Sequence, residues 1–143
     1  MKVIGFDTET DLISRGCNTP PLVCLTLAGR QDTAHLMAAL NNFENATAHL
    51  TLNGWQALVG ADCALEAYRL CRKTGATLVA HNAPFDIGVL ANHAQSIRDT
   101  ATVNTFLVDA VAAIESGSLC DTLVVEKLLT IALDLTTFDT RTS

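Results

Sequence analysis

Two carboxylates lie close together near the start of the chain, in the segment Lys2–Thr10, which reads Lys-Val-Ile-Gly-Phe-Asp-Thr-Glu-Thr. Its apolar residues are typical of a β-strand, in which side chains two positions apart point to the same face. We therefore expect Asp7 and Glu9 to project together from the end of one strand, with Thr8 on the other face. Neighbouring carboxylates repel each other unless a proton or a cation lies between them, and hard divalent cations prefer oxygen ligands. The pattern favours a metal site, but an edge strand that ends in solvent would show the same residues.

A third carboxylate, Asp86, follows the segment His-Asn-Ala-Pro-Phe. Proline is favoured at the first position of a helix, so Pro84 predicts that Asp86 lies in a first helical turn, where the helix dipole favours negative charge. Taken alone, Asp86 is an ordinary first-turn acid. Taken with Asp7 and Glu9, it completes a set of three candidate metal ligands. His81 is the histidine nearest to this set, although a histidine at the end of a strand is more often a packing residue than a ligand.

The elements expected around these residues form an α/β fold, with strands first and then a helix, a strand and more helices. The predicted strands are Lys2–Thr10, Leu22–Ala28, a short third strand at Thr33–Met37, and Thr77–His81. The predicted helices are Ala61–Thr74, Pro84–Ala94, Thr105–Ser116 and one that begins near Asp121 and runs through Ala132. The first three strands are expected to form an antiparallel meander. The stretch from Asn41 to Leu52 predicts no element.

The last two helices each show an apolar stripe at three- and four-residue spacing, which predicts the face turned toward the core. In the third helix the stripe consists of Leu107, Ala110, Val111 and Ile114. In the fourth it consists of Val125, Leu128, Leu129 and Ala132, with Asp121 as the N-cap. The residues from Leu133 to Ser143 predict no helix or strand.

The composition is that of a globular chain of one domain: 143 residues, 49% of them apolar and 17% charged. No apolar run approaches the ~18 residues of a membrane helix, and Asp7 and Glu9 interrupt the region where a signal peptide would be apolar. The five cysteines are odd in number and widely spaced, which favours free thiols in a reducing cytoplasm over zinc or disulfides.

The net charge of −6 argues against a protein that grips long duplex DNA through its phosphates. It does not argue against a site where bound metal ions meet a phosphate, because the ions supply the positive charge.

Two segments resemble the first two motifs of the four-acid (DEDD) 3′–5′ exonucleases, which have a ribonuclease H-like fold. Phe6–Thr10, Phe-Asp-Thr-Glu-Thr, is similar to the first motif, and His81–Asp86, His-Asn-Ala-Pro-Phe-Asp, is similar to the second. Gly117–Leu123 also resembles the segment in which an Asp-Thr pair opens a helix. The resemblance covers the chain from Lys2 to about Leu133. Within the family, the chain is most similar to the proofreading exonuclease domain of family A DNA polymerases of phages and bacteria. The resemblance implies a mixed sheet, an antiparallel meander plus a parallel strand, with helices on its faces.

This resemblance implies hydrolysis of the terminal phosphodiester with two Mg²⁺ or Mn²⁺ ions roughly 4 Å apart, which activate the attacking water and stabilise the leaving 3′ oxygen. Asp7 would bridge both ions, Glu9 would hold the first, and Asp86 would bind the second directly or through a water. The residues then expected around the substrate are Thr8, Leu12, Asn82 and Phe85. Leu12 or Ile13 would wedge against the terminal base, although a loop or core role is commoner for either. For Phe85 packing is the commoner role.

The third motif of this family, Tyr-x-x-x-Asp or His-x-x-x-Asp, has no counterpart here, because no Tyr follows Tyr68 and no His follows His93. The chain is therefore expected to be one exonuclease-like domain, residues 1–143, that lacks its last part. Without a fourth metal ligand and a water-positioning group worth about 10²–10⁴-fold, we expect this chain alone to be weakly active or inactive.

The sequence thus favours a DNA exonuclease that acts on single-stranded 3′ ends in the cytoplasm of a bacterial or phage-infected cell. A polymerase domain is expected in the full-length protein, and no membrane partner is expected. Two alternatives remain: an exoribonuclease with the same acids, and a noncatalytic domain of the same fold that is either an interaction module or a remnant.

Overall fold

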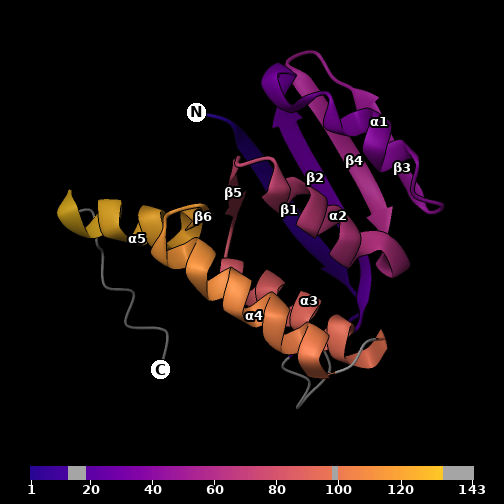
Figure 1. The fold of residues 1–143 in the computed structure, drawn as a ribbon. Helices are drawn as coiled ribbons and strands as arrows, with labels where there is room; N and C mark the ends of the chain where they lie inside the picture. The colour runs from indigo at the N-terminus through magenta and orange to yellow at the C-terminus, as the bar shows by residue number, and fades with distance from the viewer. Residues whose placement is uncertain (13–18, 98–99, 134–143) are drawn as a thin grey trace.

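The chain folds around a six-stranded mixed sheet with helices, an α/β arrangement (Figure 1). The computed structural model describes residues 1–12, 19–97 and 100–133. The strands lie in the order β3-β4-β2-β1-β5-β6, and their bounds are β1 Val3–Thr10, β2 Leu22–Arg30, β3 Ala46–Leu50, β4 Gly54–Gly60, β5 Thr77–Ala80 and β6 Leu119–Asp121. The helices are η1 Gln31–Thr33, α1 Leu36–Asn41, α2 Ala61–Lys73, α3 Ala83–Ile97, α4 Thr100–Glu115 and α5 Thr122–Ala132.

Strand β1 lies inside the sheet and joins its antiparallel part to its parallel part. It is antiparallel to β2, with Asp7 opposite Thr26, and parallel to β5, with Gly5 opposite Val79. Strand β5 is in turn parallel to β6, with Val79 opposite Cys120. The carboxyl ends of β1, β5 and β6 therefore meet at one edge of the sheet.

The two faces of the sheet differ in what covers them. Helices α1, α2 and α3 lie on one face, where the alternate β1 residues Ile4 and Phe6 are buried against them. On α2 the buried residues are Ala64, Leu65, Ala67, Tyr68 and Cys71, the apolar side of an amphipathic helix. The opposite face carries exposed side chains such as Leu58, which is 52% exposed. We call it the open face; within the described residues, α1, α2 and α3 all lie on the other side.

Most of the predicted elements are present, with ends shifted by a few residues. The second strand, the helix after β4, β5 and all later helices form where the sequence placed them, and Gly75 and Gly117 adopt positive φ just past α2 and α4. The predicted strand Thr33–Met37 is wrong: this stretch spans the end of η1 and the start of α1. The antiparallel neighbour of β2 is instead β4, which pairs with β3. All of β3 lies in the stretch from Asn41 to Leu52, where the sequence predicted no element.

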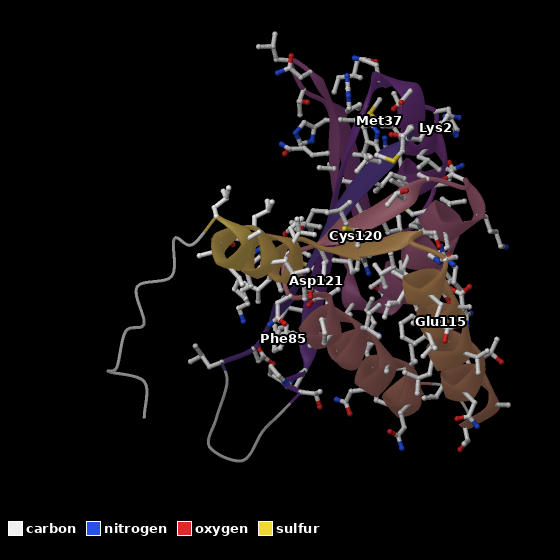
Figure 2. All side chains as sticks on the ribbon, turned by 90° about the vertical axis from the view of Figure 1, so that its left-hand side faces the viewer. Lys2, Met37, Phe85, Glu115, Cys120 and Asp121 are labelled. Carbon is white, nitrogen blue, oxygen red and sulfur yellow. The ribbon has the colours of Figure 1, made fainter. Side chains whose placement is uncertain are left out.

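The predicted core faces of the last two helices are also wrong. Helix α4 buries Phe106, Ala110 and Ala113, so that of its predicted stripe only Ala110 is buried, while Val111 and Ile114 are each 55% exposed. Both sides of α4 are apolar, and packing against α3 and against Tyr68 of α2 decides which side is buried. Helix α5 buries no residue at all and projects away from the sheet in both views (Figures 1 and 2).

Two further properties agree with the composition. None of the helices in the described ranges combines the length and the apolar character that a bilayer span needs. Cys24, Cys63, Cys71 and Cys120 are free thiols.

The orientation of α4 can be tested by two substitutions on its opposite sides. Phe106 is 2% exposed and its ring packs edge-on against Tyr68, with ring centroids 5.5 Å apart. We expect Phe106→Ala to lower the free energy of unfolding by about 3–5 kcal/mol, because it leaves a cavity. Val108 is 70% exposed, so Val108→Ala should change it by no more than about 0.5 kcal/mol. Urea denaturation measures both, and similar losses in the two variants would contradict the orientation.

Candidate active site at the carboxyl edge of the sheet

The tip of β1 presents its side chains to two different faces, as the period of a strand requires. Asp7 and Glu9 are exposed on the open face, and Thr8 is buried on the helical face at 6% exposure. Thr26, opposite Asp7 on β2, donates a hydrogen bond from its hydroxyl to the Asp7 carbonyl oxygen at 3.3 Å. The sequence prediction that Asp7 and Glu9 share one face, with Thr8 on the other, is confirmed.

Asp86 lies against the tip of β1, although 78 positions separate it from Thr8 in the chain. Its Oδ1 accepts two hydrogen bonds from Thr8, one from the backbone N–H at 2.9 Å and one from the hydroxyl at 2.6 Å. Asp86 is 1% exposed and belongs to the first turn of α3, as the sequence predicted. The second motif is thus fastened to the first through Thr8, the residue between the two acids of β1.

The charge of Asp86 is only partly compensated. Burial raises the pKa of the Asp86 carboxyl, the two bonds from Thr8 oppose that rise, and the negative charge of Asp7 adds to it. The second oxygen, Oδ2, is buried without a hydrogen-bond partner. A buried carboxylate oxygen without a partner is costly unless a proton or a cation meets it.

Cys24 lies beside the two acids on the open face, since it pairs with Glu9 in the β1–β2 register. Partial burial raises the pKa of the Cys24 thiol, and the charges of Glu9 and Asp7 raise it further. The thiol therefore stays protonated at neutral pH, which argues against a nucleophilic thiolate at this position.

The ends of β5 and β6 are tied together at the same edge of the sheet. Asp121 Oδ1 accepts from the backbone N–H of Leu123, which caps α5 as predicted, and also from the backbone N–H of Asn82 at 3.0 Å. Asn82 adopts a left-handed conformation with φ of 68°, which asparagine tolerates better than most residues. Figure 2 shows Asp121 where β6 passes into α5. This contact fixes the turn between β5 and α3, and with it the position of the second motif.

The open face is hollowed beside Asp7. A cavity of ≈ 970 Å³ runs across strands β1 to β5, with an apolar floor that includes Ala28, Leu58 and Val79. The polar side chains around it are Asp7, Thr26, Thr47, His49, Gln56, His81 and Thr122. Small and polar ligands could reach Asp7 from this side.

The structure brings only part of the predicted site together. Asp7 and Glu9 share the open face, whereas Asp86 points to Thr8 on the helical face, and nowhere in the described ranges do three His, Cys, Asp or Glu side chains form a group able to hold a metal ion. The predicted substrate residues Asn82 and Leu12 are exposed, Leu12 at 95%.

The other predicted substrate residues either take part in internal contacts or lie outside the described part of the chain. Thr8 is committed to Asp86, and Phe85 is half-buried and packs against the core, in agreement with its commoner role. Ile13 lies outside the described residues.

Sequence reasoning missed several contacts that shape this edge. Cys24 could be placed beside Glu9 only once the register of β1 with β2 was known. The link from Asp121 to Asn82 joins residues 39 apart and depends on the pairing of β5 with β6. The bond between Thr8 and Asp86 likewise depends on tertiary packing, although the burial of Thr8 followed from strand alternation.

Comparisons with protein-family models, with curated proteins and with solved structures gave no match to this chain.

The contact between Thr8 and Asp86 can be tested by removing one hydroxyl. We expect Thr8→Val to lower the free energy of unfolding by about 1.5–3 kcal/mol, the range for a hydrogen bond to a charged group, because valine keeps the shape but cannot donate. Thr26→Val removes an exposed hydroxyl and should cost no more than about 0.5 kcal/mol. Equal losses in urea denaturation would contradict a special role of Thr8.

The raised pKa of Asp86 predicts a pH dependence of stability. The folded state keeps the Asp86 proton to higher pH than the unfolded chain, whose pKa is near the ordinary 3.8. The free energy of unfolding, relative to that of the Asp86→Asn variant, should therefore fall as pH rises from 3.8 through the raised pKa, and stay level above it. Urea denaturation of both proteins in EDTA measures this difference. A difference that grows with rising pH would show that the carboxylate is stabilised rather than strained.

Proposed function

We propose that this chain is a metal-dependent 3′–5′ exonuclease domain of the four-acid family, which removes nucleotides from single-stranded DNA 3′ ends as the proofreading part of a DNA polymerase. The observation that carries the proposal is the pair of hydrogen bonds from Thr8 to Asp86. They hold the acid of the second motif directly against the strand tip that carries Asp7 and Glu9. Residues this far apart in the chain meet only because α3 packs on β1.

The arrangement of the sheet is compatible with a ribonuclease H-like fold. Strands β4, β2 and β1 pair antiparallel in that order, and β5 and β6 continue the sheet in parallel on the other side of β1. The edge strand β3 is an addition to this pattern. In open sheets with parallel strands, ligands bind outside the carboxyl ends of those strands, which is where Asp7 and Asp86 lie.

The acids fit divalent ions in their chemistry. Hard oxygen ligands suit Mg²⁺ or Mn²⁺, and the unpartnered Oδ2 of Asp86 has an unmet need for positive charge. Asp7, Glu9 and Asp86 would hold the ions, with Asp86 acting directly or through a water. When bound, two ions supply Lewis-acid activation of water and stabilisation of the leaving oxygen. Because Asp86 now faces Thr8, it would have to turn Oδ2 toward the side of Asp7.

The residues of the chain itself would position the acids and the substrate. Thr8 fixes Asp86 through Oδ1 and leaves Oδ2 for the ion. Asn82, held by Asp121 in the turn before α3, is exposed at the same edge and would contact a phosphate or an ion-bound water. With a net charge of −6, the chain would hold a strand end through the ions rather than a long duplex through cationic side chains.

The proposal can be tested with a 3′-labelled single strand in Mn²⁺. We expect release of mononucleotides that is weak, because the sequence lacks the Tyr- or His-x-x-x-Asp motif and its general-base help of about 10²–10⁴-fold. Asp7→Asn should abolish this release. Asp32→Asn, which removes an exposed acid on η1, is the matched control and should leave the release unchanged.

Binding of the ion gives a second readout that does not need turnover. Mn²⁺ should raise the melting temperature of the unaltered chain, because a ligand that binds only the folded state stabilises it, and Asp7→Asn should remove the rise. No rise and no mononucleotide release would refute the proposal. Faster release from a matched RNA strand than from DNA would instead identify an exoribonuclease, since the 2′-hydroxyl is the local difference.

One observation favours a noncatalytic domain as the second candidate. The Asp86 carboxylate is directed to Thr8, and the described residues provide no ready-made group of three ligands. A chain that keeps the fold but does not respond to Mn²⁺ would fit an interaction module.

A further inference from the structure

We propose that His81 supplies a nitrogen ligand to the divalent ion held by Asp7, so that the site takes Mn²⁺ or Co²⁺ in preference to Mg²⁺. The inference rests on the proposed function, because it concerns the ion of that same site. It assigns a task to a histidine whose commoner role at a strand end is packing.

The strand register brings His81 to the same edge of the sheet as Asp7. Gly5, Val79 and Cys120 lie side by side across β1, β5 and β6. Two positions further along the chain from each of them come Asp7 near the end of β1, His81 directly after β5, and Thr122 at the start of α5. The carboxylate, the imidazole and the hydroxyl are therefore carried by neighbouring segments of the chain. All three side chains line the hollow of the open face.

The hydrogen bonds of Thr122 are compatible with a free Nε2 on His81. The hydroxyl of Thr122 lies 3.4 Å from the carbonyl oxygen of Ala80, to which it donates, and 3.1 Å from His81 Nδ1. It accepts from His81 in the tautomer that carries its proton on Nδ1. A neutral imidazole that donates from Nδ1 carries its lone pair on Nε2. Metal-bound histidines have this arrangement, with one nitrogen held by a neighbour and the other on the ion.

Exposure argues against a purely structural role for His81. The side chain is exposed, so it fills no gap in the core, and its ring is nonetheless oriented by Thr122. An imidazole beside a carboxylate suits Mn²⁺ and Co²⁺, whereas Mg²⁺ demands oxygen ligands. The choice of ion is therefore the property that His81 would change.

The experiment compares binding of Mn²⁺, Co²⁺ and Mg²⁺ by the full chain, followed by calorimetry and by the rise in melting temperature. His81→Gln removes the nitrogen, and Thr122→Val removes the hydroxyl that orients it. Two matched controls are His49→Gln, on the far side of the same hollow, and Thr130→Val, whose hydroxyl bonds only within α5. Circular dichroism of each variant shows that the fold is kept.

We expect the unaltered chain to bind Mn²⁺ and Co²⁺ more tightly than Mg²⁺. Affinity for Mn²⁺ and Co²⁺ should fall at least about tenfold in His81→Gln and in Thr122→Val, with little change for Mg²⁺ and none in the controls. The visible absorption of bound Co²⁺ should shift in His81→Gln only.

Other outcomes separate this inference from the proposed function. Ion binding that depends on Asp7 but is unaltered in His81→Gln would overturn the role of His81 and leave the exonuclease proposal standing. Absence of any ion binding would overturn both.

Discussion

The hydrogen bonds between Thr8 and Asp86 are the constraint on which the candidate site depends. They connect the central strand of the sheet to the first turn of α3, and they bury a carboxylate that has only one of its two oxygens satisfied. A partly satisfied buried acid costs stability, and such groups gather at functional sites, where a ligand completes them. Another contact at this edge supports the position of α3. Asp121 accepts a hydrogen bond from the backbone N–H of Asn82, and the turn at Asn82 directly precedes the first residue of α3.

Strand alternation separates the acids of β1 from the acid of α3. Asp7 and Glu9 face the hollow, and Thr8 faces the helix that carries Asp86. The two sides are one strand thickness apart, close enough for the charge of Asp7 to raise the pKa of Asp86. A divalent ion at the strand tip would relieve the repulsion on both sides at once. This relief of repulsion is the physical basis of the proposed ion site, and the proposed nitrogen ligand His81 would affect which ion the site takes.

Sequence reasoning succeeded where a short period decides the outcome. Alternation on β1 placed Asp7 and Glu9 together and Thr8 on the other face, and the proline at position 84 placed Asp86 in the first turn of α3. It failed for a helix whose two sides are equally apolar, and for contacts between residues that are far apart in the chain. Helix α4 carries apolar residues on both sides, so the sequence could not tell that Phe106 rather than Val111 faces inward. The partner of Asp86 and the neighbour of Glu9 on β2 depend on packing and register, which no local pattern contains.

Helix α5 differs from the other α-helices because none of its residues is buried. Unwinding it would therefore uncover little apolar surface that is not already in contact with water. Its helical conformation is stabilised mainly by the Asp121 cap and by intrinsic helix propensity. That propensity is lowered by the β-branched residues Val124, Val125 and Ile131, and a lone helix of 11 residues is marginal in water. Backbone amides of α5 should therefore exchange with solvent deuterium through brief local opening, long before those of β1 and α2 exchange through global unfolding.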